Sequence, residues 1–117
     1  MAVLDTAAHK LLAKIQLPEG SLPMGTTVSA DGKELFVSTG RKNSVAVIDT
    51  KTNTVSAIVP VGTRAWGIAL SPDGTKLYSA NGASDDVSVV DVKGRKELKR
   101  IKVGSGPWGV TTVGAGR

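Results

Sequence analysis

The sequence predicts an all-β protein built from four-stranded antiparallel sheets that repeat every 42 residues. The first observation is repetition: Trp66-Gly67 recurs as Trp108-Gly109, and the SADG of residues 29–32 recurs as the SPDG of residues 71–74. The second observation is composition, because 14 Gly and only 3% aromatic residues favour short aliphatic strands joined by tight turns. A fixed period of about 20 to 50 residues is typical of repeat architectures.

Residues 66–103 predict one complete sheet. Ser71, Pro72 and Gly74 occupy the first, second and fourth places of a turn, where a type I turn prefers them. A polar loop over 81–86 separates the second strand from the third, and Ile101 alternates with charged residues in the fourth. The four predicted strands cover residues 66–70, 76–80, 87–91 and 97–103.

The same template applies to the rest of the chain. The preceding copy predicts strands over 25–29, 34–38, 45–49 and 54–61. At the N-terminus, residues 1–6 match the third strand of that copy, and a fourth strand follows over 11–17. At the C-terminus, residues 108–113 predict a lone first strand. The predicted units are therefore residues 1–23, 24–61, 66–103 and 108–117.

Four-stranded sheets repeated at this spacing are the blades of a β-propeller, which packs them face to face around a central channel. The third strands at 45–48 and 87–90 are apolar or small on both faces, as strands covered on two sides must be. We therefore predict β-propeller blades, with two complete blades and a partial blade at each end.

The repeats resemble the YVTN family of propeller repeats, also called the surface-layer-protein type. Residues 45–55 (VAVIDTKTNTV) match one part of its pattern, and 61–74 match the part ending in SPDG. Residues 78–81 (YSAN) depart from the signature at Ser79, and residues 36–39 (FVST) depart at three of four places. The resemblance implies a periplasmic or extracellular parent protein. Relatives include proteins of unknown ligand and domains of amine dehydrogenases and haem enzymes, and lactonase-type propellers are similar.

The predicted ring is incomplete, since propellers typically have four to eight blades. An open arc would expose the apolar faces of its terminal blades. We expect either that the chain is a fragment whose missing blades lie elsewhere in a longer chain, or that copies self-associate to close the ring. The chain as given has no signal-peptide pattern. Its apolar runs fall far short of the roughly 20 residues that span a bilayer.

Charge and cysteine content limit the classes of partner. Six of the 15 basic residues lie between Lys93 and Lys102, within a net charge of +5. We interpret this run as a solvated outer strand whose lysines discourage edge-to-edge aggregation, with an anion-binding stripe as the alternative. No aromatic residue is interleaved for base stacking, so no nucleic-acid partner is predicted. The absence of Cys excludes disulfides, thiolate metal sites and covalent haem attachment.

Catalytic and metal-ligating candidates are few. His9 is the only histidine; it falls in a predicted turn, and no second His or Cys exists to share a metal. No catalytic residue, metal or cofactor is therefore predicted. We expect the aspartates that recur once per blade to accept hydrogen bonds from their own turns: these are Asp5, Asp31, Asp49, Asp73 and Asp91.

The candidate ligand-binding residues include two tryptophans and an arginine. Trp66 and Trp108 open the first strands of successive blades, and the resemblance implies that such strands line the channel. Packing between blades is the alternative role for both rings and the one that we favour. Arg64 is replaced by Gly106 in the next copy, so its charge is specific to one blade and is positioned to stand at the channel entrance.

Asp85 and Asp86 complete the candidate set, because Asn43-Ser44 replaces them in the preceding copy. Together these features favour a non-catalytic repeat module that binds an unidentified protein or small molecule through its loops. The alternative is a fragment of a propeller enzyme of the lactonase, amine-dehydrogenase or haem-oxidoreductase type.

Overall fold

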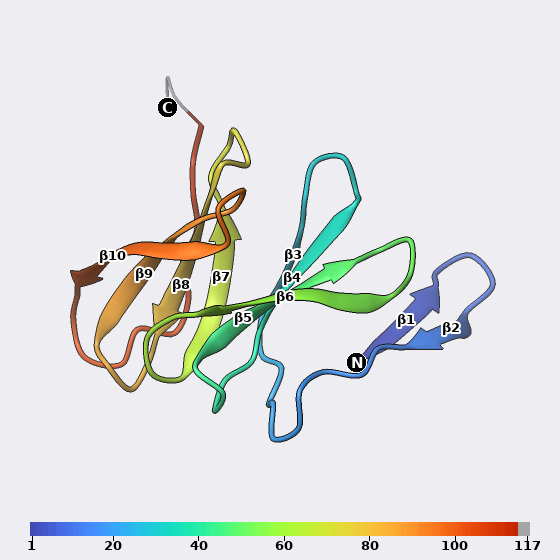
Figure 1. Ribbon diagram of the computed structural model, residues 1–117, viewed down its shortest axis with the longest axis horizontal. Coiled ribbons are helices and arrows are strands. Elements are labelled where there is room, and N and C mark those ends of the chain that lie inside the picture. Colours follow the sequence, from blue (N-terminus) through green and yellow to red (C-terminus); the bar gives the residue numbers. More distant parts are fainter. Residues whose placement is uncertain (115–117) are drawn as a thin grey trace.

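The computed structural model describes residues 1–114, which form three antiparallel sheets arranged like a fan (Figure 1). A two-stranded sheet pairs β1 (Ala2–Asp5) with β2 (Lys10–Lys14). The first blade has the order β3-β4-β5-β6, and the second has the order β7-β8-β9-β10. Their strands are β3 (Thr26–Val28), β4 (Glu34–Ser38), β5 (Ser44–Asp49), β6 (Thr54–Pro60), β7 (Ala65–Leu70), β8 (Lys76–Asn81), β9 (Asp86–Asp91) and β10 (Lys96–Lys102). The predicted all-β blade fold is confirmed.

The two blades pack face to face, with β3 beside β7 and β6 beside β10. Residues of both sheets form the core between them: Phe36, Val45, Val47, Val59, Val61, Ala65, Ile68, Leu77 and Val90. A second core joins Ile15 and Leu17 of the N-terminal segment to Val37, Ala46 and Ile48 on the opposite face of the first blade. Each described joint between sheets therefore has an aliphatic core.

The tight turns form as the sequence predicts. The Gly74 amide donates to the Ser71 carbonyl at 2.8 Å, and the Gly32 amide donates to the Ser29 carbonyl at 2.9 Å. The Asp73 carboxylate accepts hydrogen bonds from the Ser71 hydroxyl and from the amide and hydroxyl of Thr75. These donors, the Ser71 hydroxyl foremost, lower the pKa of Asp73 to about 2.

Glycines allow the first strands of neighbouring blades to approach closely. A Cβ atom on Gly25 would lie 2.7 Å from the carbonyl oxygen of Trp66. A Cβ atom on Gly67 would lie 2.8 Å from the carbonyl oxygen of Trp108. Both distances are too short for a side chain, so glycine is required where backbone meets backbone.

The predicted strand over 108–113 forms no sheet ladder within residues 1–114. The segment lies alongside β7, where the Gly67 amide donates to the Trp108 carbonyl at 3.1 Å and the Thr112 hydroxyl donates to the Leu70 carbonyl at 2.6 Å. A first strand forms its ladder with the second strand of its own blade, and no such strand follows among the described residues. The rest of that predicted unit, residues 115–117, lies outside them.

The outer faces of the fan are open. Ile101 and Val103 are 44% and 41% exposed, whereas their counterparts Val59 and Val61, which the second blade covers, are 1% and 5% exposed. These unclosed sheets are consistent with a fragment that needs other blades. Among residues 1–114, no helix has the length and apolarity needed to cross a membrane.

Candidate functional site

The candidate site lies at the end of the molecule where one blade is joined to the next. We call this the linker end; it comprises the loops at 39–44 and 81–86 and the connections at 61–64 and 103–106. Residues 61–64, the linker between the two complete blades, hold Arg64. Most of the ligand-binding candidates predicted from the sequence lie on or beside these four segments.

A buried polar network lies beneath the linker. The Asn81 side-chain amide donates to the Asp86 carboxylate and to the Ser88 hydroxyl, both at 2.8 Å. Its carbonyl oxygen accepts the Ser79 hydroxyl at 3.1 Å, and the Ser84 hydroxyl donates to Asp86 at 2.8 Å. Asn81, Ser79 and Ser88 are fully buried, so each polar atom needs such a partner.

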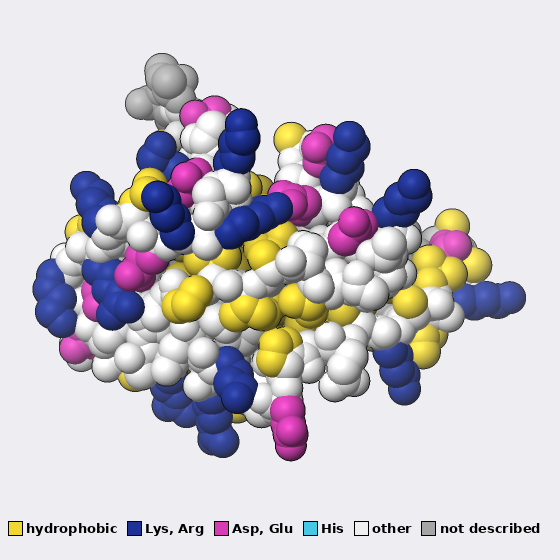
Figure 2. Space-filling model, viewed as in Figure 1, with side chains coloured by type: hydrophobic (Ala, Val, Ile, Leu, Met, Phe, Trp, Pro, Cys, Tyr) yellow, Lys and Arg dark blue, Asp and Glu magenta, His cyan; other side chains and the backbone are white. Residues whose placement is uncertain are grey.

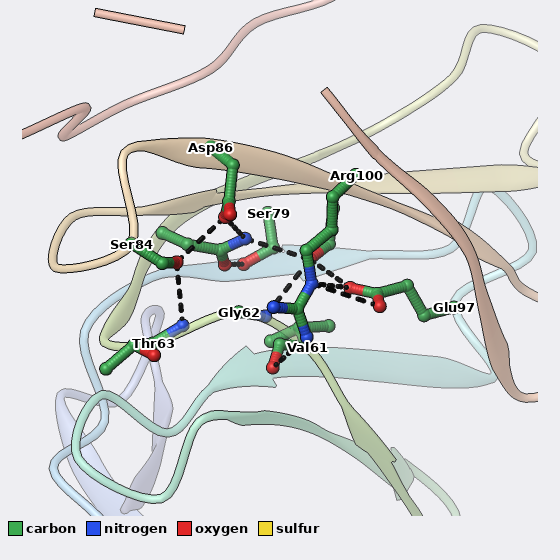
Figure 3. Close-up of polar contacts among 10 residues, drawn as sticks. Val61, Gly62, Thr63, Ser79, Ser84, Asp86, Glu97 and Arg100 are labelled. Atoms are coloured by element: carbon green, nitrogen blue, oxygen red, sulfur yellow. Dashed lines mark hydrogen bonds and ion pairs between the residues drawn. The ribbon is translucent and has the colours of Figure 1, made fainter. Parts of the chain in front are cut away.

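The network holds the linker in place (Figure 3). The Gly62 amide donates to the Ser88 hydroxyl at 3.1 Å, and the Thr63 amide donates to the Ser84 hydroxyl at 2.9 Å. Gly62 is pressed against the same groups, because a Cβ atom there would lie 2.3 Å from the Asn81 side-chain nitrogen. Hydrogen bonds and close packing thus fix the linker backbone.

An ion pair on the outer strand closes the network. The Ser88 hydroxyl donates to the Glu97 carboxylate, which accepts the Arg100 Nε at 3.0 Å. The Arg100 guanidinium also donates to the Val61 carbonyl at 3.3 Å, so a side chain of the outer strand β10 is hydrogen-bonded to the linker backbone (Figure 3). Its hydrogen bond to Glu97 raises the pKa of Arg100, which favours the charged form.

Arg64 has a left-handed backbone, with φ at 58°. The corresponding residue of the next connection is a glycine, Gly106, with φ at 61°. A non-glycine residue in this conformation is strained by about 1 kcal/mol. The Arg64 amide donates to the Asn43 side-chain oxygen at 2.9 Å, while the residue itself is exposed.

Arg95 provides a comparison, because it is a second left-handed arginine, with φ at 56°. Its guanidinium pairs with Glu34 across the joint between the two blades and donates to the Val92 carbonyl at 2.9 Å. The strain at Arg95 is therefore matched by a structural contact. In the described part of the chain, no hydrogen bond or ion pair engages the Arg64 side chain.

The two tryptophans form an edge-to-face pair, with ring centroids 6.0 Å apart and planes at 87°. The Trp66 ring packs on Gly82, where a Cβ atom would lie 2.5 Å from it. The Gly82 amide donates to the Arg64 carbonyl at 3.0 Å, so the pair adjoins the linker. Trp66 is half-buried, as packing requires, whereas Trp108 is 71% exposed.

Asp85 and Asp86, treated as one pair in the sequence, have separate roles. Asp85 accepts the Gly106 amide at 2.9 Å, as Asn43 accepts the amide of Arg64. Asp86 is only 7% exposed and belongs to the buried network. Sequence reasoning missed Asn81, Ser88, Glu97 and Arg100. The last three are polar where the preceding copy has the apolar residues Ala46, Val55 and Ile58.

The other titratable groups that the sequence analysis considered lie in turns. Asp5 accepts the Ala7 amide and Asp49 accepts the Lys51 amide, both at 2.8 Å, which confirms their predicted turn role. His9 is exposed in the β1–β2 turn, with φ at 54°. Among residues 1–114, no three His, Cys, Asp or Glu side chains are grouped as a metal site requires.

Known proteins share the fold. No family model matches the sequence, and no curated protein matches it. A chain of Kuenenia stuttgartiensis hydrazine synthase is 38% identical over 85% of this chain, with a TM-score of 0.74. Citrobacter koseri AztD is 20% identical over 97%, with a TM-score of 0.74, and U3-55K is 13% identical over 80%, with a TM-score of 0.70.

These neighbours have β-propeller-type folds, and one of them is an enzyme. The chain spans 29% of the hydrazine synthase chain, 32% of AztD and 30% of U3-55K. It therefore matches part of a propeller, in agreement with its open outer faces.

Proposed function

We propose that the chain is part of a non-catalytic propeller of the YVTN repeat type that binds a ligand or partner through its linker-end loops. The observation that carries this proposal is Arg64, an exposed residue with φ at 58° where Gly106 stands in the next connection. Strained backbone positions cluster at functional sites, where the role of the side chain offsets the conformational cost. For Arg95, the contact of its side chain with Glu34 offsets the cost of the left-handed backbone. For Arg64, contacts with a bound ligand would offset that cost.

The surroundings of Arg64 support a binding role. The buried network fixes the linker backbone through Gly62 and Thr63, which restricts the position from which Arg64 projects. Trp108, beside Trp66, offers an exposed indole face next to the same linker. Because the backbone that holds Arg64 is already fixed, binding there costs only the conformational entropy of the side chain.

The remaining parts of the proposal concern the parent protein. We propose that the predicted units 1–23, 24–61, 66–103 and 108–117 belong to one ring, which further blades complete. The resemblance to YVTN repeats supports a periplasmic or extracellular location. Fractionation of the source cells, with an antibody against this chain, tests that location and gives the mass of the parent protein.

The binding role is tested by amide chemical-shift mapping of the ¹⁵N-labelled chain against a diverse fragment library. We expect hits to shift amides in 40–43, 61–66, 82–85 and 104–108. Arg64→Gly should weaken these hits, whereas Lys99→Ala, which removes an exposed cation from β10, should leave them unchanged. Hits confined to the turns at 71–75 and 91–95, or unaffected by Arg64→Gly, would contradict the proposal.

A propeller segment of an enzyme is the second candidate function. The 38% identity to a hydrazine synthase chain over 85% of this chain supports it. In that case the catalytic residues lie in blades beyond the described ones. The native protein captured by the antibody should then have a larger mass than this chain and should carry an absorbing or reactive cofactor. A parent protein that carries no such cofactor would exclude haem-type enzymes.

A further inference from the structure

Three exposed cations lie on two adjoining segments of the linker end. Arg41 and Lys42 lie in the β4–β5 loop, and Arg64 lies in the linker. Two hydrogen bonds join these segments: the Arg64 amide donates to Asn43 at 2.9 Å, and the Gly40 amide donates to the Ala65 carbonyl at 3.1 Å. Figure 2 shows Lys and Arg side chains gathered at the lower edge of the molecule, where this loop lies in Figure 1.

The fold leaves these charges uncompensated. The ion pairs of the described residues are Arg95 with Glu34 and Arg100 with Glu97, and neither involves the three cations. The basic run at 93–102 differs, because its Arg95, Arg100 and Lys102 side chains make contacts within the fold; Lys102 donates to the Ser84 carbonyl at 2.9 Å. We call Arg41, Lys42 and Arg64 the cation cluster; among the described residues, no ion pair engages any of these three side chains.

We propose that this cation cluster binds a multiply charged oxyanion, such as a diphosphate or tricarboxylate group. The inference rests on the proposed binding function and names the ligand class of that site. Two guanidinium forks provide paired donors to a planar or tetrahedral oxyanion, and the Lys42 ammonium adds a point charge. The hydrogen bonds between the two segments fix the backbone from which the three side chains project, which reduces the entropic cost of bringing them to one anion.

A neighbouring loop limits the charge of the site. The Lys42 side chain passes 3.3 Å from the place that a Cβ atom on Gly20 would occupy, so the loop holding Glu19 adjoins the cluster. Glu19 is exposed and carries the opposite charge. Glu19→Gln should therefore tighten oxyanion binding.

Isothermal titration calorimetry of the full chain with inorganic pyrophosphate and with citrate tests the proposal at low salt. We expect one site for at least one of the two, much weaker binding of inorganic phosphate, and affinity that falls as salt rises. Arg64→Gly should weaken binding about tenfold, since it removes a charge-assisted hydrogen bond. That variant copies Gly106, which has the same left-handed backbone, so we expect it to keep the fold. Lys99→Ala is the charge-matched control and should bind as the parent does.

Several outcomes would overturn the inference: no binding of either anion, equal weakening by Lys99→Ala, or binding only of an acidic peptide such as oligoglutamate. Fragment hits that map to the linker end but carry no negative charge would reject the oxyanion and leave the proposed binding function intact. Failure of both experiments would reject both.

Discussion

The two joints of the molecule use the same repeat and are held in different ways. In the first, between the N-terminal sheet and the first blade, Val37, Ala46 and Ile48 pack against Ile15 and Leu17. In the second, between the two blades, the positions of Val37 and Ala46 are occupied by Ser79 and Ser88, which belong to the polar network. We call these the apolar joint and the polar joint.

The difference shows what polar residues add to an already sufficient aliphatic core. In the apolar joint, aliphatic side chains exclude water, and the connection is held by backbone hydrogen bonds such as that from the Leu22 amide to the Thr39 carbonyl at 3.0 Å. The polar joint also fixes the backbone of Gly62 and Thr63 by hydrogen bonds, and Arg100 holds the Val61 carbonyl. The linker fixed in this way is the one that carries Arg64. We interpret the network as a support for that side chain.

The largest expected effect comes from removing the centre of the polar joint. Asn81→Ala would leave the buried Asp86 carboxylate without the Asn81 donor, and we expect a loss of about 3 kcal/mol in unfolding free energy. Thr39→Ala, at the matching place in the first blade, removes only hydroxyl contacts and should cost about 1 kcal/mol. Urea unfolding of both variants measures the difference, and equal losses would show that the joints are equivalent.

The next effect comes from the contact between linker and network. Gly62→Ala places a Cβ atom 2.3 Å from the Asn81 side-chain nitrogen, so we expect destabilisation of about 2 kcal/mol from overpacking. Gly104→Ala, 42 residues later, meets no atom within 4 Å and should change stability little. Thermal unfolding of the two variants measures the difference in stability. A Gly62→Ala variant as stable as the parent would mean that the linker is not closely packed against the network.

A smaller effect of opposite sign is expected at Arg64. Arg64→Gly relieves the left-handed strain and should stabilise the chain by about 1 kcal/mol. Arg95→Gly relieves similar strain but breaks the contact with Glu34, so its gain should be smaller or absent. Denaturant titration of the two variants measures the contrast. A loss of stability in Arg64→Gly would reveal a structural role for that side chain.

The smallest difference concerns the turns that both blades share. Serine hydroxyls and backbone amides lower the pKa values of Asp31 and Asp73, and Asp73 has the Thr75 hydroxyl as a further donor. A lowered pKa in the folded state stabilises the protein above the ordinary value of 3.8, and this contribution is lost as pH falls towards about 2.

NMR titration of the carboxyl groups should therefore give Asp73 a pKa of about 2, and Thr75→Val should raise this pKa. An Asp73 midpoint at its ordinary value would contradict the turn geometry.

The sequence predicted the blades well because periodicity and turn chemistry are local signals. The SPDG turn and the alternating strands follow from residues close together in the chain. The polar network was missed because Asn81, Ser88 and Glu97 meet only after three strands pair. A comparison of each position with the one 42 residues earlier would have indicated the network, since charged residues replace apolar ones there: Glu97 replaces Val55 and Arg100 replaces Ile58.

The candidate site was predicted in part. The sequence singled out Arg64 because Gly106 replaces it in the next copy, but its left-handed backbone is visible only in the structure. Asp85 and Asp86 are neighbours in sequence with different roles, because Asp85 lies in the loop before β9 with φ at 57°, whereas Asp86 is the first residue of β9. Arg41 and Lys42 drew no attention in the sequence, since only the structure shows that their loop is hydrogen-bonded to the linker that holds Arg64.

The close approach at Gly25 and Gly67 also determines the geometry of the arc. Neighbouring sheets touch backbone to backbone at their first strands but are separated by full side chains farther out. Each sheet is therefore rotated relative to the next about the contact between their first strands. The angle added per blade depends on this difference in spacing between the inner and outer strands. Enlarging Gly25 or Gly67 would open the inner spacing and reduce that angle, so that more blades would be needed to complete a turn.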